Sequence, residues 1–377
     1  MADRKRQRRI LVTGVSGSAV IVGAGIFGSS LAYRLARDGW DVTLYEQYEP
    51  GHERAASGGE SRLIRFAHGS DAWYTRSAWR ARELWRELEA ETGRELLVEC
   101  GIVWFGRSED GWEAKSERVL RAEGIPVERL SAEDGHRFFP SFEPGDLEFI
   151  VREPEAGVLR AAEATRATAE AAKRAGVRLV HEAAEPGRVE ADAVVWACGA
   201  WLASLYSGLV QLRVTRQDLF FVRADESWRT PPVPAWVDYD RAVYGLGDLD
   251  GVGVKLAPDY EGPEFDPETG EREPDPVNET RARGYAAERF PALADAPLAL
   301  AKVCQYSLTP DTNFILAPHP ELPGNWIFGG GSGHGFKHGP ALAEYAARVV
   351  SGEEEPDERF GLGPRGRGPS LRTAGTT

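Results

Sequence analysis

The feature that most constrains this chain is a glycine-rich turn between an apolar run and a helical pattern. Gly23, Gly25 and Gly28 follow the apolar run 19–22 and open a segment with helical spacing that ends at Gly39. Glycines at this spacing allow a tight turn, close approach of the backbone to a pyrophosphate, and a helix N-terminus directed at its negative charge. The pattern therefore predicts a dinucleotide-binding unit of the Rossmann type.

An acidic residue stands where the second strand of this unit would end. Glu46 directly follows the apolar run 42–45. A carboxylate at this place can bind the ribose hydroxyls of an adenosine. The glycines and Glu46 together predict a bound dinucleotide, but on their own they leave FAD and NAD both open.

The remaining sequence alternates between two kinds of pattern. The expected elements are a helix over 71–92, a strand over 97–105, a charged helix ending at 124, a helix over 161–175, strands over 177–180, 193–197, 213–222 and 242–255, and an acidic loop over 259–276. The first and middle parts keep a β-α-β rhythm, whereas the later strands suggest an antiparallel sheet. We therefore expect an α/β chain in which a Rossmann-type domain is interleaved with an antiparallel-sheet domain.

Length, charge and cysteine content narrow the class of partner. With 377 residues, 42% of them hydrophobic, the chain can bury the cores of two domains. A formal net charge of −14 disfavours nucleic acid and anionic membranes as partners and favours small molecules. The three cysteines form no CxxC pair, so they suggest neither a disulfide framework nor a zinc site, and no metal is expected. This composition fits a reducing cytoplasm.

The basic run 4–9 has three readings: a nuclear signal, a nucleic-acid-binding arm or the start of a twin-arginine export signal. Only the apolar residues 10–12 follow it, far fewer than the roughly 7–15 of a signal-peptide core. We expect residues 1–18 to be a disordered tail or to reflect a start codon assigned too early. No stretch approaches the roughly 20 apolar residues of a membrane span.

Three further motifs resemble those of one flavoprotein family. They are Arg62-Leu63-Ile64-Arg65, the segment 302–311, and Gly333-His334-Gly335-Phe336-Lys337. In this order and spacing, the chain resembles the monomeric sarcosine oxidase and N-methyltryptophan oxidase family of FAD-dependent amine oxidases from about residue 19 to about residue 359. The domains this implies are an FAD-binding domain over 19–92, 153–212 and 305–360, a substrate domain over 93–152 and 213–304, and a flexible tail over 361–377.

The resemblance also implies how the cofactor is held. FAD would be attached covalently through a thioether to Cys304, whose thiolate is the nucleophile. The small-residue loop 56–65, including Ser61 and Arg62, would run along the flavin ring. The loop carrying Gly333 and Gly335 would direct backbone N–H groups and a helix dipole at negative charge on that ring.

Several residues match the catalytic positions of the family. Arg65 and Lys337 match the pair that clamps the substrate carboxylate, Arg as a bidentate fork and Lys as a point charge beside the cofactor. Lys255 matches the lysine that promotes reaction of the reduced flavin with dioxygen, because it stabilises the charge that develops there. The matches to pocket tyrosines are Tyr244 and Tyr306, and Arg62 would add positive potential at the flavin.

The implied activity is oxidation of the C–N bond of a secondary, N-alkyl amino acid to an imine. Dioxygen would be reduced to hydrogen peroxide, and the enzyme would act as a monomer on a small amine or amino acid. Glycated amino acids, N-methyltryptophan-like substrates and cyclic imino acids stay open as alternatives within this class. Lys255 disfavours a dehydrogenase that feeds a quinone. A non-catalytic flavin-binding interaction subunit is the alternative from another class.

Two positions depart from the family pattern. Gly58 and Asp259 stand where the family has histidines. Asp259 either lines the pocket or belongs to the acidic loop that follows it, and the sequence does not favour one of these. Loss of both histidines alters the fit of the substrate, so sarcosine itself is less secure than the reaction type.

Overall fold

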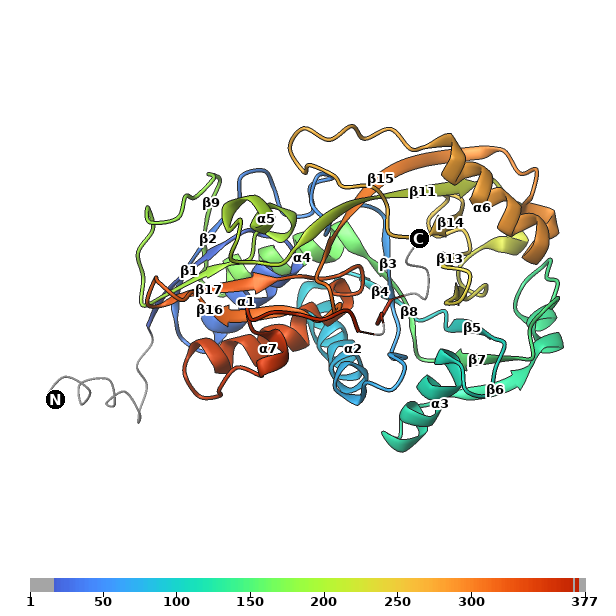
Figure 1. The fold of residues 1–377 in the computed structure, drawn as a ribbon, viewed down its shortest axis with the longest axis horizontal. Coiled ribbons are helices and arrows are strands. Elements are labelled where there is room, and N and C mark those ends of the chain that lie inside the picture. Colours follow the sequence, from blue (N-terminus) through green and yellow to red (C-terminus); the bar gives the residue numbers. More distant parts are fainter. Residues whose placement is uncertain (1–16, 369, 373–377) are drawn as a thin grey trace, which may run out of the picture.

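The computed structural model describes residues 17–368 and 370–372. The expected disordered tail falls, up to residue 16, outside the described residues, as do residues 369 and 373–377. The described chain forms two halves, each built on its own sheet, and the long strands β11 and β15 run from one half to the other (Figure 1). Among the described residues, no helix combines the length and the apolar character needed to cross a bilayer.

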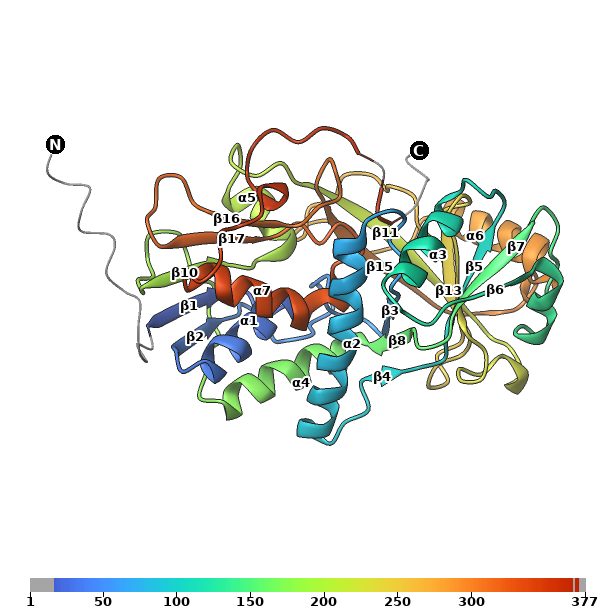
Figure 2. The ribbon, with the colours of Figure 1, turned by 90° about the horizontal axis from the view of Figure 1, so that it is seen from below.

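The first sheet is parallel apart from one edge strand. In spatial order its strands are β16 (Ile315–Pro318), β17 (Asn325–Gly329), β10 (Ala193–Trp196), β1 (Ser18–Val22), β2 (Asp41–Tyr45) and β9 (Arg178–Val180). Strand β1 pairs in parallel with β2 and β10, and β16 is antiparallel to β17. Helix α1 (Ile26–Arg37) packs against α4 (Ala161–Arg174) and α7 (Gly339–Val350) beside this sheet (Figure 2). This is the predicted Rossmann-type unit.

The second sheet is largely antiparallel. Its order is β15 (Leu298–Leu308), β11 (Arg213–Val222), β14 (Val254–Pro258), β13 (Val243–Leu246), β12 (Ala235–Asp238), β5 (Ile102–Gly106), β7 (Phe149–Glu153) and β6 (Glu128–Ser131). Helices α3 (Trp112–Ala122) and α6 (Pro276–Arg289) lie in this half (Figure 1). Strand β15 pairs along its length with β11, so the boundary expected between residues 304 and 305 cuts through one strand.

A small third sheet and a long helix connect the halves. The sheet consists of β3 (Ser61–Ile64), β8 (Gly157–Arg160) and β4 (Leu97–Val98). Helix α2 (Ala72–Thr92) is capped by Asp71, whose carboxylate accepts the N–H groups of Trp73 and Tyr74. The short helix α5 (Leu202–Leu205) completes the set of α-helices in the described part of the chain. The assignment of these segments to a cofactor domain and a substrate domain stays a prediction.

Two predicted strands are broken by turns. The run 97–105 divides into β4 and β5 in different sheets, because Gly101 adopts a left-handed φ of 79° between them. The run 242–255 becomes the hairpin β13–β14, with Asp250, Gly251 and Gly253 all at positive φ. In both cases an apolar pattern continues across a glycine that reverses the chain.

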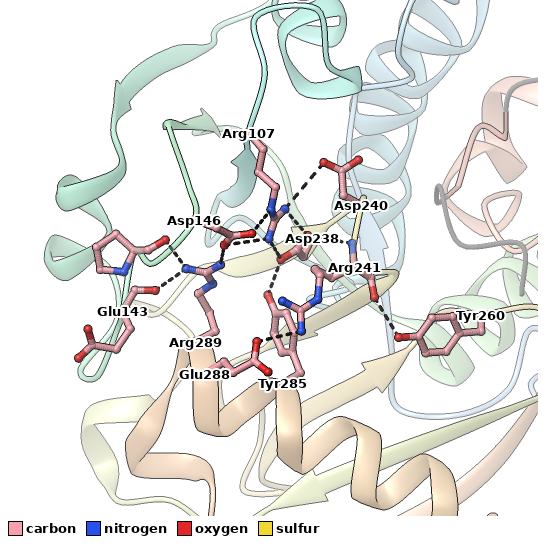
Figure 3. Close-up of polar contacts among 11 residues, drawn as sticks. Arg107, Glu143, Asp146, Asp238, Asp240, Arg241, Tyr260, Tyr285, Glu288 and Arg289 are labelled. Carbon is pink, nitrogen blue, oxygen red and sulfur yellow. Dashed lines mark hydrogen bonds and ion pairs between the residues drawn. The ribbon is translucent and has the colours of Figure 1, made fainter.

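A buried ionic network holds α6 to the second sheet (Figure 3). Asp238 is fully buried, and both of its carboxylate oxygens accept hydrogen bonds from Arg107, at 2.7 and 2.9 Å. Tyr285 of α6 donates to the same carboxylate at 3.1 Å. Arg289 and Arg107 share Asp146 at the surface. The Asp238 carboxylate therefore satisfies donors from two parts of the chain, Arg107 directly after β5 and Tyr285 in α6.

Replacing Asp238 with alanine is expected to destabilise the protein by about 1–3 kcal/mol, because the buried Tyr285 hydroxyl and the partly buried Arg107 guanidinium lose an acceptor. Thermal and urea unfolding of the two proteins measures this. The matched control is Glu185→Ala, since the Glu185–Arg188 pair is exposed and contributes less than about 1 kcal/mol. Equal stabilities of the Asp238 and Glu185 variants would contradict the interpretation.

Candidate functional site

The glycine turn after β1 leaves no room for side chains. Gly23 adopts φ 101°, and a Cβ there would lie 2.6 Å from the carbonyl oxygen of Ala197. A Cβ on Gly28 would lie 1.9 Å from the carbonyl oxygen of Gly23. Helix α1 begins directly after Gly25, without a side-chain cap and without an acidic residue in its first turn. The turn thus offers a helix N-terminus to an anion, and the helix itself places no acidic side chain at that end.

A cavity of about 340 Å³ opens at this turn. The predicted cofactor and pocket residues that line it are Gly23, Gly25, Glu46, Arg62, Tyr306, Gly333 and Gly335. Glu46 accepts the backbone N–H of Ala24 at 2.7 Å, which holds its carboxylate beside the glycine turn. The cavity therefore joins the dinucleotide turn to the glycine-rich loop before α7, as an elongated cofactor requires.

Arg62 lines this cavity and contacts Cys304. The Arg62 guanidinium donates to the carbonyl oxygens of Ala56 and Gly58, at 2.8 and 2.9 Å, and to the Cys304 sulfur at 3.3 Å. A cation at this distance stabilises a thiolate. Ser61, the other predicted residue of this loop, lines a second cavity instead, and its buried hydroxyl has no partner among the described residues.

Gly58 explains one departure from the family pattern. A Cβ at this position would lie 2.3 Å from the carbonyl oxygen of His52. The loop conformation therefore has no space for the histidine that the family carries there, and the local backbone must differ.

Lys255 is buried beside the two predicted tyrosines. It lies in β14, with only 1% of its surface exposed, and its ammonium lies 5.0 Å from the centre of the Tyr244 ring. Burial and, to a smaller extent, the nearby charge of Arg62 lower the pKa of Lys255 to about 7. The pKa of Tyr306 is raised by burial and by Asp259. The predicted oxygen-activating lysine is thus about half protonated near pH 7.

Arg65 and Lys337 are both buried. The Arg65 guanidinium lies 5.4 and 5.7 Å from the ring centres of Trp104 and Trp112, and it donates to the carbonyl oxygen of Leu371 at 2.6 Å. Burial lowers the pKa of Arg65 to about 10. Lys337 donates to the carbonyl oxygen of His334 at 2.6 Å, and burial and the charge of Arg65 lower its pKa.

The sequence interpretation missed the counter-charge to this pair. Glu153, at the end of β7, is fully buried and accepts N–H groups from Phe66, Ala67 and the Trp104 indole. Its charge favours the protonated forms of both Arg65 and Lys337. The buried cations Arg65 and Lys337 face the buried carboxylate of Glu153, so a bound anion can neutralise the remaining positive charge. The sequence does carry one signal that could have identified Glu153, namely a glutamate at the end of an apolar strand.

Asp259 directly follows β14 and is buried, beside the cavity-lining residue Tyr306. Its carboxylate accepts the Tyr306 hydroxyl at 3.0 Å and pairs with Arg372 at 2.7 Å. The Arg372 guanidinium also lies 5.0 Å from the centre of the Tyr306 ring.

Three residues of the segment that we expected to be a flexible tail contact the rest of the chain. Leu371 and Arg372 are buried, and Arg365 forms a partly buried ion pair with Asp311. The physical reason is charge. Asp259 pairs with Arg372 and Asp311 pairs with Arg365, whereas the composition of the segment alone indicates that these arginines are exposed to solvent.

Most of this chain is similar in sequence to known flavoproteins. A family model described as FAD dependent oxidoreductase (DAO) matches residues 18–349. A monomeric sarcosine oxidase of Bacillus sp. (strain B-0618) is 30% identical, with 90% of this chain and 93% of the relative covered. A monomeric sarcosine oxidase of Streptomyces avermitilis is 31% identical, covering 88% and 92%, and N-methyl-L-tryptophan oxidase of Yersinia pestis is 26% identical, covering 89% and 95%.

Solved structures share the fold at lower identity. L-proline dehydrogenase from P. horikoshii superposes with a TM-score of 0.80 at 21% identity, over 93% of this chain and 98% of that one. A fructosyl peptide oxidase superposes with a TM-score of 0.79 at 20% identity, over 96% and 97%. The predicted mixed α/β fold with a Rossmann-like cofactor domain is confirmed.

Proposed function

Because the chain belongs to the DAO family of FAD-dependent oxidoreductases, we propose that it oxidises the C–N bond of an N-alkyl amino acid to an imine. Two electrons and two protons pass from the substrate to dioxygen, giving hydrogen peroxide. The observation that carries this proposal is the buried pair Arg65 and Lys337, whose positive charges both act on the buried carboxylate of Glu153. A substrate carboxylate supplies the missing negative charge.

Different residues of this chain bind the cofactor, bind the substrate and act on oxygen. Bound FAD supplies the two-electron acceptor, held by the glycine turn, Glu46 and the loop of Gly333 and Gly335. Arg65 and Lys337 bind and orient the substrate carboxylate, which sets the C–H bond in reach of the acceptor. Lys255 provides positive charge where oxygen is reduced.

The proposal is tested by hydrogen peroxide release. Purified enzyme is supplied with N-methyl, cyclic and glycated amino acids under oxygen, and peroxide and oxygen uptake are measured together. Peroxide from one class identifies the substrate, whereas no peroxide from any of them contradicts the oxidase assignment and supports a non-catalytic flavin-binding subunit.

The pocket also supports the second candidate within this class. Asp259, Tyr306 and Arg372 place a carboxylate, a hydroxyl and a guanidinium together where the family has a histidine. Such groups hydrogen-bond a polar, hydroxyl-bearing substituent on the amine nitrogen. A glycated amino acid carries this substituent, and faster turnover of it than of sarcosine would select this candidate.

Covalent attachment of FAD at Cys304 is part of the proposal. The support is the contact between Arg62 and the Cys304 sulfur. Acid precipitation of the wild-type protein is expected to leave a yellow pellet, and Cys304→Ser is expected to give a colourless pellet with a yellow supernatant. The matched control is Cys198→Ser, because Cys198 also lines the cavity but is not the attachment site. A colourless wild-type pellet would refute the tether.

A further inference from the structure

Two histidines of the segment 334–338 and a third, His68, from near the other end of the chain converge in the structure. His68 precedes α2, His334 lies in the glycine-rich loop, and His338 ends the short helix before α7. All three are buried, with 0%, 5% and 0% of their surfaces exposed. One ring nitrogen from each lies within 4.8 Å of those of the other two.

Hydrogen bonds fix which nitrogen of two of these rings keeps its lone pair. His68 Nδ1 lies 2.9 Å from the carbonyl oxygen of Phe66, so this nitrogen carries the hydrogen. His334 Nε2 lies 2.9 Å from the carbonyl oxygen of Thr312 and donates likewise. A carbonyl can only accept, so the lone pairs of these neutral rings lie on His68 Nε2 and His334 Nδ1.

The third ring is held by a hydroxyl. His338 Nδ1 lies 3.0 Å from the Ser77 hydroxyl of α2, which can accept its hydrogen and leave the lone pair on Nε2. The other nitrogen of each of these three rings, His68 Nε2, His334 Nδ1 and His338 Nε2, is buried and has no hydrogen-bond partner among the described residues. Each ring therefore pairs one hydrogen-bonded nitrogen with one unpartnered nitrogen.

We infer that His68, His334 and His338 form a binding site for a divalent transition-metal ion of the zinc class. Three imidazole nitrogens with an open fourth position are a ligand set that zinc uses. A hydrogen bond from the far nitrogen of each ligand to a carbonyl or hydroxyl is the usual outer support of such a site. Burial lowers the pKa of all three rings, which keeps them neutral as metal ligands require.

Small movements of the three ligand nitrogens are enough to form a tetrahedral zinc site. Zinc–nitrogen bonds of about 2.1 Å in a tetrahedral site put ligand nitrogens about 3.4 Å apart. From separations of at most 4.8 Å, each nitrogen must move by no more than roughly 0.8 Å. The rings pack on Tyr74 and Phe314, so the shell around the site is aromatic. Gly333 and Gly335, on either side of His334, line the cavity at the glycine turn.

The surrounding charges select the kind of ion. Lys337 and Arg65 both lower the pKa of the three histidines, so positive charge opposes a cation here. Hard ions such as Mg²⁺ and Ca²⁺ bind through oxygen ligands, which this cluster does not offer. Zn²⁺, Ni²⁺ and Cu²⁺ bind imidazole strongly enough to overcome such repulsion.

The test is metal binding by the flavin-loaded full chain after treatment with a chelator. Equilibrium dialysis against Zn²⁺ is expected to give one ion per chain, and Co²⁺ is expected to show the intense visible bands of a four-coordinate site beyond the flavin absorption. His68→Phe and His338→Phe keep an aromatic ring of similar size and are each expected to weaken Zn²⁺ binding at least hundredfold. Ser77→Ala is expected to weaken it about tenfold, since it removes only the outer hydrogen bond.

The matched control is His181→Gln. His181 is exposed and lies outside the cluster, so this variant is expected to bind Zn²⁺ as the wild type does. If the phenylalanine variants do not fold, the Ser77 variant and the wild-type Co²⁺ spectrum decide. No stoichiometric Zn²⁺ binding, an octahedral Co²⁺ spectrum, or equal affinity in a folded His68→Phe protein overturns the site and leaves a buried water as the partner of these nitrogens. Because none of these readouts depends on turnover, they are independent of the oxidase assignment.

Discussion

Replacing Lys255 with methionine is expected to slow reoxidation of the bound cofactor by oxygen about 10²–10³-fold, while reduction by substrate changes far less. Lys255 is buried beside Arg62, Tyr244 and Cys304, where a positive charge acts on oxygen reduction without screening by water. Stopped-flow measurement of the two half-reactions separates the effects. Equal slowing of both would reject the role of Lys255.

The same lysine predicts a pH dependence. Its pKa is lowered from 10.5 to about 7, chiefly by burial, so the ammonium form dominates below pH 7 and is lost as the pH rises through that value. The oxygen half-reaction is therefore expected to slow with rising pH in the wild type and to lose this dependence in Lys255→Met. Lys302→Met is the control, because Lys302 lies on the partly exposed side of β15 and pairs with Glu60.

Replacing Arg65 with methionine is expected to lower kcat/KM for amino acid substrates roughly hundredfold. This corresponds to about 3 kcal/mol of lost transition-state stabilisation, because the substrate loses a charged hydrogen-bonding partner. Methionine fills the space against Trp104 and Trp112 without the charge. Steady-state kinetics measures the change, which should lie mainly in KM.

Two comparisons isolate the carboxylate contact. Arg129→Met makes the same substitution at an arginine that also lies over an aromatic ring, that of Phe149, but outside the pocket, so its kinetics should match the wild type. An amine that lacks the carboxylate should be oxidised equally by the wild type and Arg65→Met. A hundredfold loss with that amine would show that Arg65 acts on the fold rather than on the substrate.

The parts of the site that sequence predicts are those carried by local patterns. Gly23, Gly25, Gly28 and Glu46 stand at fixed offsets from one strand and one helix. The structure brings Gly23, Gly25 and Glu46 to one cavity. Lys255 and Lys337 carry no local signal, and only resemblance to a family identified them. Their burial follows from the pairing of strands and loops that are distant in the sequence.

The missed residues share one cause. Glu153, Arg372 and the three histidines acquire their surroundings from contacts across the whole chain. Arg372 sits in a segment rich in Gly, Pro and Arg, whose composition indicates disorder, and only its partner Asp259 explains its burial. The spacing of His334 and His338 was visible, but His68 completes the cluster from 266 residues away (334 − 68).

The order of strands in the first sheet has a consequence for how the protein is made. Strand β1 pairs with β10, which begins at residue 193, and β10 in turn pairs with β17, which begins at residue 325. At about 5–20 residues per second, the ribosome adds β17 roughly 15–60 s after β1. The edge of β1 that pairs with β10 stays open until β10 has been added, roughly 9–35 s after β1, and the edge of β10 that pairs with β17 then stays open until the end of that interval. An unpaired edge invites association with other chains. The cofactor turn, although it is encoded first, is among the last features of the nascent chain to be completed.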